Sequence, residues 1–141
     1  MMFGLQGEIA LITGASRGIG RAIALNMGQQ GASIVGTSTS ELGARGVTAA
    51  LSEAGIKGRG AVLDVTHGES VLKVVRQIEE NFGPISILIN NAGITRDNLV
   101  LRMKDEEWDE ILETNLSSVF RVTKACLRGM IRARRGRVIN V

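Results

Sequence analysis

Short apolar runs alternate along the chain with longer segments in which apolar and polar residues recur at helical spacing. The apolar runs predict strands at about 8–13, 33–38, 60–65, 85–90 and 137–141. The helical segments lie at about 18–30, 41–54, 68–82 and 106–133, with a short turn or helix near 97–103. This alternation is typical of βαβ units. We therefore expect an α/β fold with a doubly wound parallel sheet (Rossmann-type), forming one domain over 1–141 and truncated after the fifth strand.

Local signals refine three of these elements. Gly31 is positioned to end the first helix. Thr66, with Glu69 three residues later, resembles a capping box for the third helix. The run 85–90 is apolar almost throughout, which favours a central strand covered on both faces.

The segment Thr13–Gly20 reads Thr-Gly-Ala-Ser-Arg-Gly-Ile-Gly, directly after the first predicted strand and at the start of a helix. In this context Gly14 would turn the backbone off the strand, Gly18 would let it approach a pyrophosphate, and Gly20 would let the helix pack closely. Free amides and the helix dipole would meet the phosphate charge. The segment predicts a dinucleotide site.

The end of the second strand indicates which dinucleotide. NAD-binding versions of the fold place an acidic residue there to bind the ribose 2′-hydroxyl. Here the residues are Gly36-Thr37-Ser38-Thr39-Ser40, and the first acid is Glu41. Arg17 can supply positive charge and a forked set of donors to a 2′-phosphate. NADP(H) is therefore favoured over NAD(H).

Several motifs together resemble the short-chain dehydrogenase/reductase family. They are the loop 13–20, Asp64-Val65 after the third strand, and Asn90-Asn91-Ala92-Gly93 after the fourth. The longer strings 91–99, 102–108 and 114–121 resemble the bacterial branch of that family that reduces 3-oxoacyl groups on acyl carrier protein in fatty acid biosynthesis.

The resemblance implies roles for individual residues. Asp64 would bond the adenine amino group, and Asn91 would lie beside the cofactor ribose. Asn115 corresponds to a catalytic asparagine that shapes a helix kink and holds a water in the proton relay. The full set of implied cofactor-binding residues is Gly14, Ser16, Arg17, Gly18, Ile19, Gly20, Thr39, Asp64, Val65, Asn91, Ala92 and Gly93.

The chain departs from the family in its catalytic residues. The family serine and its Tyr-x-x-x-Lys pair cannot be placed here, and the chain contains no tyrosine. No other residue replaces them: His67 is expected to be a cap or surface residue, and Cys126 inert packing. We expect the N-terminal part of a longer NADP-dependent reductase, inactive alone. The alternative is a non-catalytic fragment that binds nucleotide or a partner.

Charge and composition bear on partners and location. Arg128, Arg132, Arg134, Arg135 and Arg137 crowd the end of the chain. They suit a solvated helix end, or, by resemblance, a docking patch for acyl carrier protein at Arg134. Nucleic-acid binding is least favoured because aromatic residues are not interleaved. The single cysteine, and the lack of a secretory or membrane-spanning pattern, favour the cytoplasm. The resemblance implies a homotetramer, and no metal site is expected.

Overall fold

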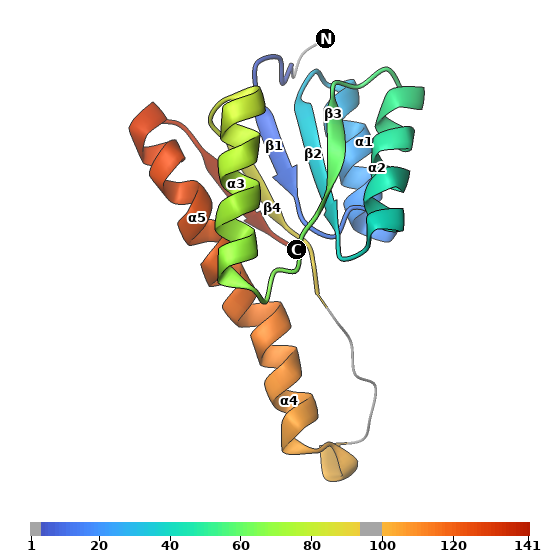
Figure 1. The fold of residues 1–141 in the computed structure, drawn as a ribbon, viewed down its shortest axis with the longest axis vertical. Helices are drawn as coiled ribbons and strands as arrows, with labels where there is room; N and C mark the ends of the chain where they lie inside the picture. Colours follow the sequence, from blue (N-terminus) through green and yellow to red (C-terminus); the bar gives the residue numbers. More distant parts are fainter. Residues whose placement is uncertain (1–3, 94–99) are drawn as a thin grey trace.

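A computed structural model describes residues 4–93 and 100–141 and contains a five-stranded parallel sheet (Figure 1). The strands are β1 (Ile9–Ile12), β2 (Ser33–Ser38), β3 (Gly58–Val62), β4 (Ile87–Asn90) and β5 (Arg137–Asn140), in the order β3-β2-β1-β4-β5. The helices are α1 (Gly18–Gln29), α2 (Glu41–Glu53), α3 (Gly68–Phe82), α4 (Asp105–Leu112) and α5 (Ser118–Ala133), with a 3₁₀ turn at Val100–Arg102 and a π-helical segment at Glu113–Ser117. The predicted doubly wound fold is confirmed.

Alternate residues of the central strands face opposite layers of the molecule. In β1, Ala10 and Ile12 belong to the core under α1 and α2, whereas Leu11 belongs to the core under α3 and α5. Strand β4 repeats this alternation and is fully buried, as its apolar run predicted. A strand covered on both faces is the arrangement that parallel sheets require.

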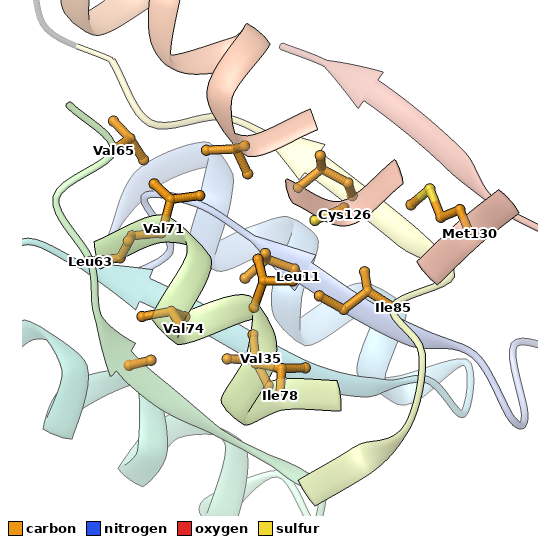
Figure 2. Packing of buried hydrophobic residues seen from close by; sticks show 14 residues of the cluster. Leu11, Val35, Leu63, Val65, Val71, Val74, Ile78, Ile85, Cys126 and Met130 are labelled. Atoms are coloured by element: carbon orange, nitrogen blue, oxygen red, sulfur yellow. The ribbon is translucent and has the colours of Figure 1, made fainter. Parts of the chain in front are cut away.

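The core under α3 and α5 is a single apolar cluster (Figure 2). Residues Val71, Val74 and Ile78 of α3 lie in it together with Cys126 and Met130 of α5. Cys126 has no exposed surface, and burial raises the pKa of its thiol to about 12. The expectation that Cys126 packs in the core is confirmed, and its burial predicts an unreactive thiol.

Element boundaries differ most from prediction in the third strand and the last helical segment. The third strand spans 58–62, not 60–65, because the chain turns at Asp64, where the His67 amide donates to the Asp64 carbonyl at 3.1 Å. The predicted uninterrupted helix 106–133 is α4, the π-helical segment and α5 in succession. The predicted turn near 97–103 is the 3₁₀ turn at 100–102, and its first residues lie outside the described part of the chain.

The predicted capping box at Thr66 is wrong. Helix α3 begins at Gly68, and His67 is its N-cap residue. The Thr66 hydroxyl instead donates to the Asp64 Oδ1 at 2.5 Å. Asp64 is two residues away and accepts from both the Thr66 amide and its hydroxyl, so it outcompetes the helix end for this side chain.

The outer side of the last elements is exposed. Within the described residues β5 pairs with β4 only, and Ile139 is 50% exposed. Helix α5 also carries exposed apolar side chains, namely Phe120, Leu127 and Ile131. No helix in the described ranges is long and apolar enough to cross a membrane.

Candidate nucleotide-binding site

The predicted site residues gather where the strand order reverses. Strand β1 lies between β2 and β4, so the helices after β1 and β4 go to opposite faces of the sheet. In open α/β sheets this switch point leaves a crevice outside the carboxyl ends of the strands, where ligands bind. The glycine loop follows β1, and Asn91-Ala92-Gly93 follows β4.

Two threonines hold the loop after β1, one by bonding the loop after β4 and one by bonding it to β2. The Thr13 hydroxyl accepts from the amides of Asn91 and Ala92, each at 3.0 Å. The Thr37 hydroxyl at the end of β2 accepts from the Gly14 amide at 3.3 Å. Both threonines are buried, so these bonds fix the backbone that borders the crevice.

Gly14 and Gly20 occupy positions that exclude a side chain. Gly14 has φ +67°, a conformation that favours glycine. The side-chain amide of Asn91 (Nδ2) donates to the Gly14 carbonyl at 2.9 Å. A Cβ on Gly20 would lie 2.1 Å from that carbonyl oxygen and 2.5 Å from the Asn91 Nδ2. The close approach of α1 to the strand end therefore depends on Gly20, as predicted.

Gly18 is different, because a side chain there would point into open space. Its φ is +61°, and no described atom lies within 4 Å of a Cβ built on it. Arg17 precedes α1 as an exposed N-cap residue, with no side-chain cap bond and no acid in the first turn of this helix. The amino end of α1 therefore presents free amides and partial positive charge, which fits a phosphate.

A cavity of about 420 Å³ lies at the carboxyl ends of β1–β4. It brings together six of the predicted cofactor residues: Gly14, Thr39, Asp64, Val65, Ala92 and Gly93. Ser16, Arg17, Gly18, Ile19, Gly20 and Asn91 do not line it. Gly20 and Asn91 support the wall from behind, and Ser16 lines a small hollow between α1 and α2.

Asp64 organises the wall of the cavity after β3. Its Oδ1 accepts from the Thr66 hydroxyl at 2.5 Å and from the Thr66 amide at 2.9 Å. The His67 Nδ1 lies 2.9 Å from its Oδ2. These hydrogen bonds, those from Thr66 first, hold the pKa of Asp64 below its ordinary value. Asp64 is thus an anchored, ionised acceptor.

Asn115 lies in the π-helical segment, where the helix carries an irregularity of the kind found at functional sites. The side chain is exposed, and its Oδ1 would lie 2.9 Å from a Cβ on Gly93. Asn115 therefore lies beside the loop after β4, and the kink that the resemblance implies at this residue stays a prediction.

Sequence reasoning missed several residues that build the site. Thr13 and Thr37 had a signal, since each stands at the carboxyl end of a buried strand. Glu110 and Glu113 also line the cavity, yet they looked like ordinary members of an acidic stretch. Buried Asn90 donates to Asn140 at 2.9 Å and to Thr123 at 3.2 Å, tying β4 to β5 and α5. No group of residues in the described part could hold a metal ion.

The fold and the site together define a class of protein: a Rossmann-type α/β domain with a glycine-rich loop at its switch point. The family model for short chain dehydrogenases matches residues 8–141. The chain belongs to that family.

Curated relatives agree with this assignment. The chain is 56% identical over 137 residues to the 3-oxoacyl-[acyl-carrier-protein] reductase FabG of Haemophilus influenzae. The aligned region covers 97% of this chain and 55% of that protein. It is 54% identical over 136 residues to FabG of Escherichia coli, covering 96% of this chain and 54% of that protein. The chain thus spans about half the length of the curated relatives it matches.

Proposed function

We propose that this chain forms the cofactor-binding part of an NADPH-dependent reductase that converts 3-oxoacyl-[acyl-carrier-protein] to 3-hydroxyacyl-[acyl-carrier-protein] in the cytoplasm. The observation that carries the proposal is the cavity at the switch point, which joins the glycine loop to a β2 end without a carboxylate. The names of the curated relatives supply the substrate class.

The preference for NADP(H) rests on charge. A carboxylate at the end of β2 would repel a 2′-phosphate, whereas Thr39 offers a hydroxyl and an amide. Arg17 stands at the amino end of α1 with its side chain exposed, so its guanidinium is free to reach an anion at the cavity rim. Asp64 and Val65 would receive the adenine, and Asn91 the ribose.

NADPH would supply the hydride when bound. The residues of this chain would bind and orient it: the amides of the glycine loop hold the pyrophosphate, while Ile19 and Gly93 border its path. Asn115 would hold a water at its exposed amide. The proton donor of the family is a tyrosine, which these 141 residues lack, so we expect residues 1–141 alone to bind cofactor without turnover.

Two protein contacts belong to the proposal. Arg134 ends α5 in a left-handed conformation (φ 55°) that places it in an exposed basic segment, suited to an acidic carrier protein. The exposed Leu116, Phe120, Leu127 and Ile131 recur along one side of the α5 region, so we expect homo-oligomers, tetramers by family, to cover them.

The test is cofactor discrimination at Arg17. Calorimetric titration should show that Arg17→Ala weakens NADPH binding by about 1.5–3 kcal/mol, the range for a hydrogen bond to a charged group, and leaves NADH nearly unchanged. Arg21→Ala is the matched control, because Arg21 lines the hollow between α1 and α2. Equal losses of both cofactors in Arg17→Ala would contradict NADP selectivity.

A second candidate is a binding module that holds nucleotide or a partner without any reductase activity. The two differ in one assay. The test protein is one in which a serine and a Tyr-x-x-x-Lys pair follow this chain. If it oxidises NADPH with a 3-oxoacyl substrate, the reductase is supported. Cofactor binding with no such continuation supports the binding module.

A further inference from the structure

The turn after β3 holds a histidine that the proposed function does not use. The His67 amide donates to the Asp64 carbonyl at 3.1 Å, which closes the turn 64–67. Its Nδ1 lies 2.9 Å from the Asp64 Oδ2 and 3.4 Å from the Thr66 hydroxyl. The imidazole therefore sits against the carboxylate that lines the cavity.

We propose that His67 is a positioning residue for the adenine end of the cofactor, and that its protonation and cofactor binding strengthen each other through Asp64. This inference rests on the proposed function, since it takes the adenine to lie at Asp64. His67 does not line the cavity itself, so it acts through the carboxylate.

The geometry explains how Asp64 is held. An ionised carboxylate has about four acceptor positions. The Thr66 amide and hydroxyl occupy Oδ1, and the His67 Nδ1 occupies one position on Oδ2. A position on Oδ2 remains for the amino group of adenine, on the same oxygen that the His67 Nδ1 contacts.

Protonation of His67 would strengthen cofactor binding, for two reasons. The bond from Nδ1 becomes charge-assisted, so the carboxylate is fixed more firmly. The new positive charge also lies beside a cavity that receives an anionic cofactor. Because Asp64 has a lowered pKa, its carboxylate stays ionised at about pH 5.5 and above.

Other charged groups surround this turn. Glu110 and Glu113 line the same cavity from α4 and the π-helical segment. Arg121 of α5 lies near the start of α3: its Cδ would lie 3.7 Å from a Cβ on Gly68, and its guanidinium pairs with Glu113. On α3 itself, Glu69 stands in the first turn.

The expected size is modest, because the His67 side chain is 72% exposed. Exposed ion pairs change an equilibrium by about two- to fivefold. Coupling is reciprocal, so the fold-change in cofactor affinity between protonated and neutral His67 must equal the change that the cofactor causes in the proton affinity of His67. Both quantities can be measured independently.

The experiment uses NADP⁺ and the chain of residues 1–141. Calorimetric titrations at about pH 5.5 and pH 8 compare the chain with His67→Gln, which keeps a side-chain donor but cannot gain a proton. The 2′-phosphate of NADP⁺ titrates in the same range, and the variant corrects for it. The low-pH gain in affinity should be about two- to fivefold larger with histidine than with glutamine.

Nuclear magnetic resonance provides the second readout. The chain has one histidine, so its imidazole signal needs no assignment. Saturating NADP⁺ should strengthen proton binding to the imidazole by about two- to fivefold, the same fold-change that the calorimetry measures. Asp64→Asn should abolish this effect, because it removes the carboxylate that couples the two events.

The outcomes separate the two hypotheses. Failure of the chain and the His67→Gln variant to bind NADP⁺ at either pH would overturn the proposed cofactor site and this inference together. NADP⁺ binding with the same pH dependence in both, or with no change in the His67 signal, would overturn this inference alone.

Discussion

Replacing Gly20 by alanine is the sharpest test of how the loop and α1 fit together. A Cβ there would lie 2.1 Å from the Gly14 carbonyl oxygen, and both atoms belong to elements fixed by the sheet. Real carbon–oxygen contacts are more than 1 Å longer, so α1 must move away or the bond from Asn91 to Gly14 must break.

The free-energy change follows from three contributions. Alanine is a better helix former than glycine by about 1 kcal/mol. Forcing an extra carbon into a packed site costs about 1–3 kcal/mol, and losing the Asn91 bond costs about 1 kcal/mol. We therefore expect Gly20→Ala to lower the free energy of unfolding by about 1–3 kcal/mol.

Gly46→Ala is the matched control. Gly46 lies exposed in the middle of α2, and no described atom lies within 4 Å of a Cβ built there. The same substitution should stabilise the chain by about 0.5–1 kcal/mol. In urea unfolding followed by circular dichroism, with a slope of about 2 kcal/mol per molar urea, the two midpoints should differ by about 1–2 M. A Gly20→Ala midpoint equal to or above that of Gly46→Ala would refute the packing argument.

Three further outcomes are expected. Gly18→Val should abolish NADPH binding in calorimetric titration with little change in circular dichroism, since its side chain points into the space that the pyrophosphate needs; unchanged affinity would mean that the turn does not hold phosphate. Cys126 should resist a thiol reagent at pH 8 and react fully in urea, because the pKa of the buried thiol is about 12, whereas rapid modification of the folded chain would contradict its burial. Purified 1–141 should sediment as oligomers or aggregates and show no NADPH oxidation with a 3-oxoacyl substrate, and turnover by a monodisperse, mass-verified sample would overturn the assigned mechanism.

Much of the fold could be predicted because its signals are local. The apolar runs in β1, β2 and β4 are short and continuous, and Gly14 and Gly31 both have the positive φ that their turns require. The strand order β3-β2-β1-β4-β5 was not among the predictions from sequence, because no local pattern specifies which strands pair.

The features that escaped prediction depend on contacts between distant segments or on competition for one side chain. Thr66 could cap α3 or bond Asp64, and the sequence pattern does not rank the two. Glu110 of α4 lines the cavity, and nothing in the local pattern distinguishes it from the rest of the acidic stretch. The bonds of Asn90 to Thr123 and Asn140 join residues 33 and 50 positions apart, which no local pattern reveals.

The π-helical segment Glu113–Ser117 has a consequence for the surface of the whole 105–133 region. One such turn accommodates about one residue more than an α-helical turn, so side chains before it are rotated by roughly 100° relative to those after it. The outward faces of α4 and α5 therefore point in directions that differ by this rotation. Deleting one residue in this segment would swing Trp108 and the acidic side chains of α4 to a new side of the molecule, while α5 kept its place on the sheet.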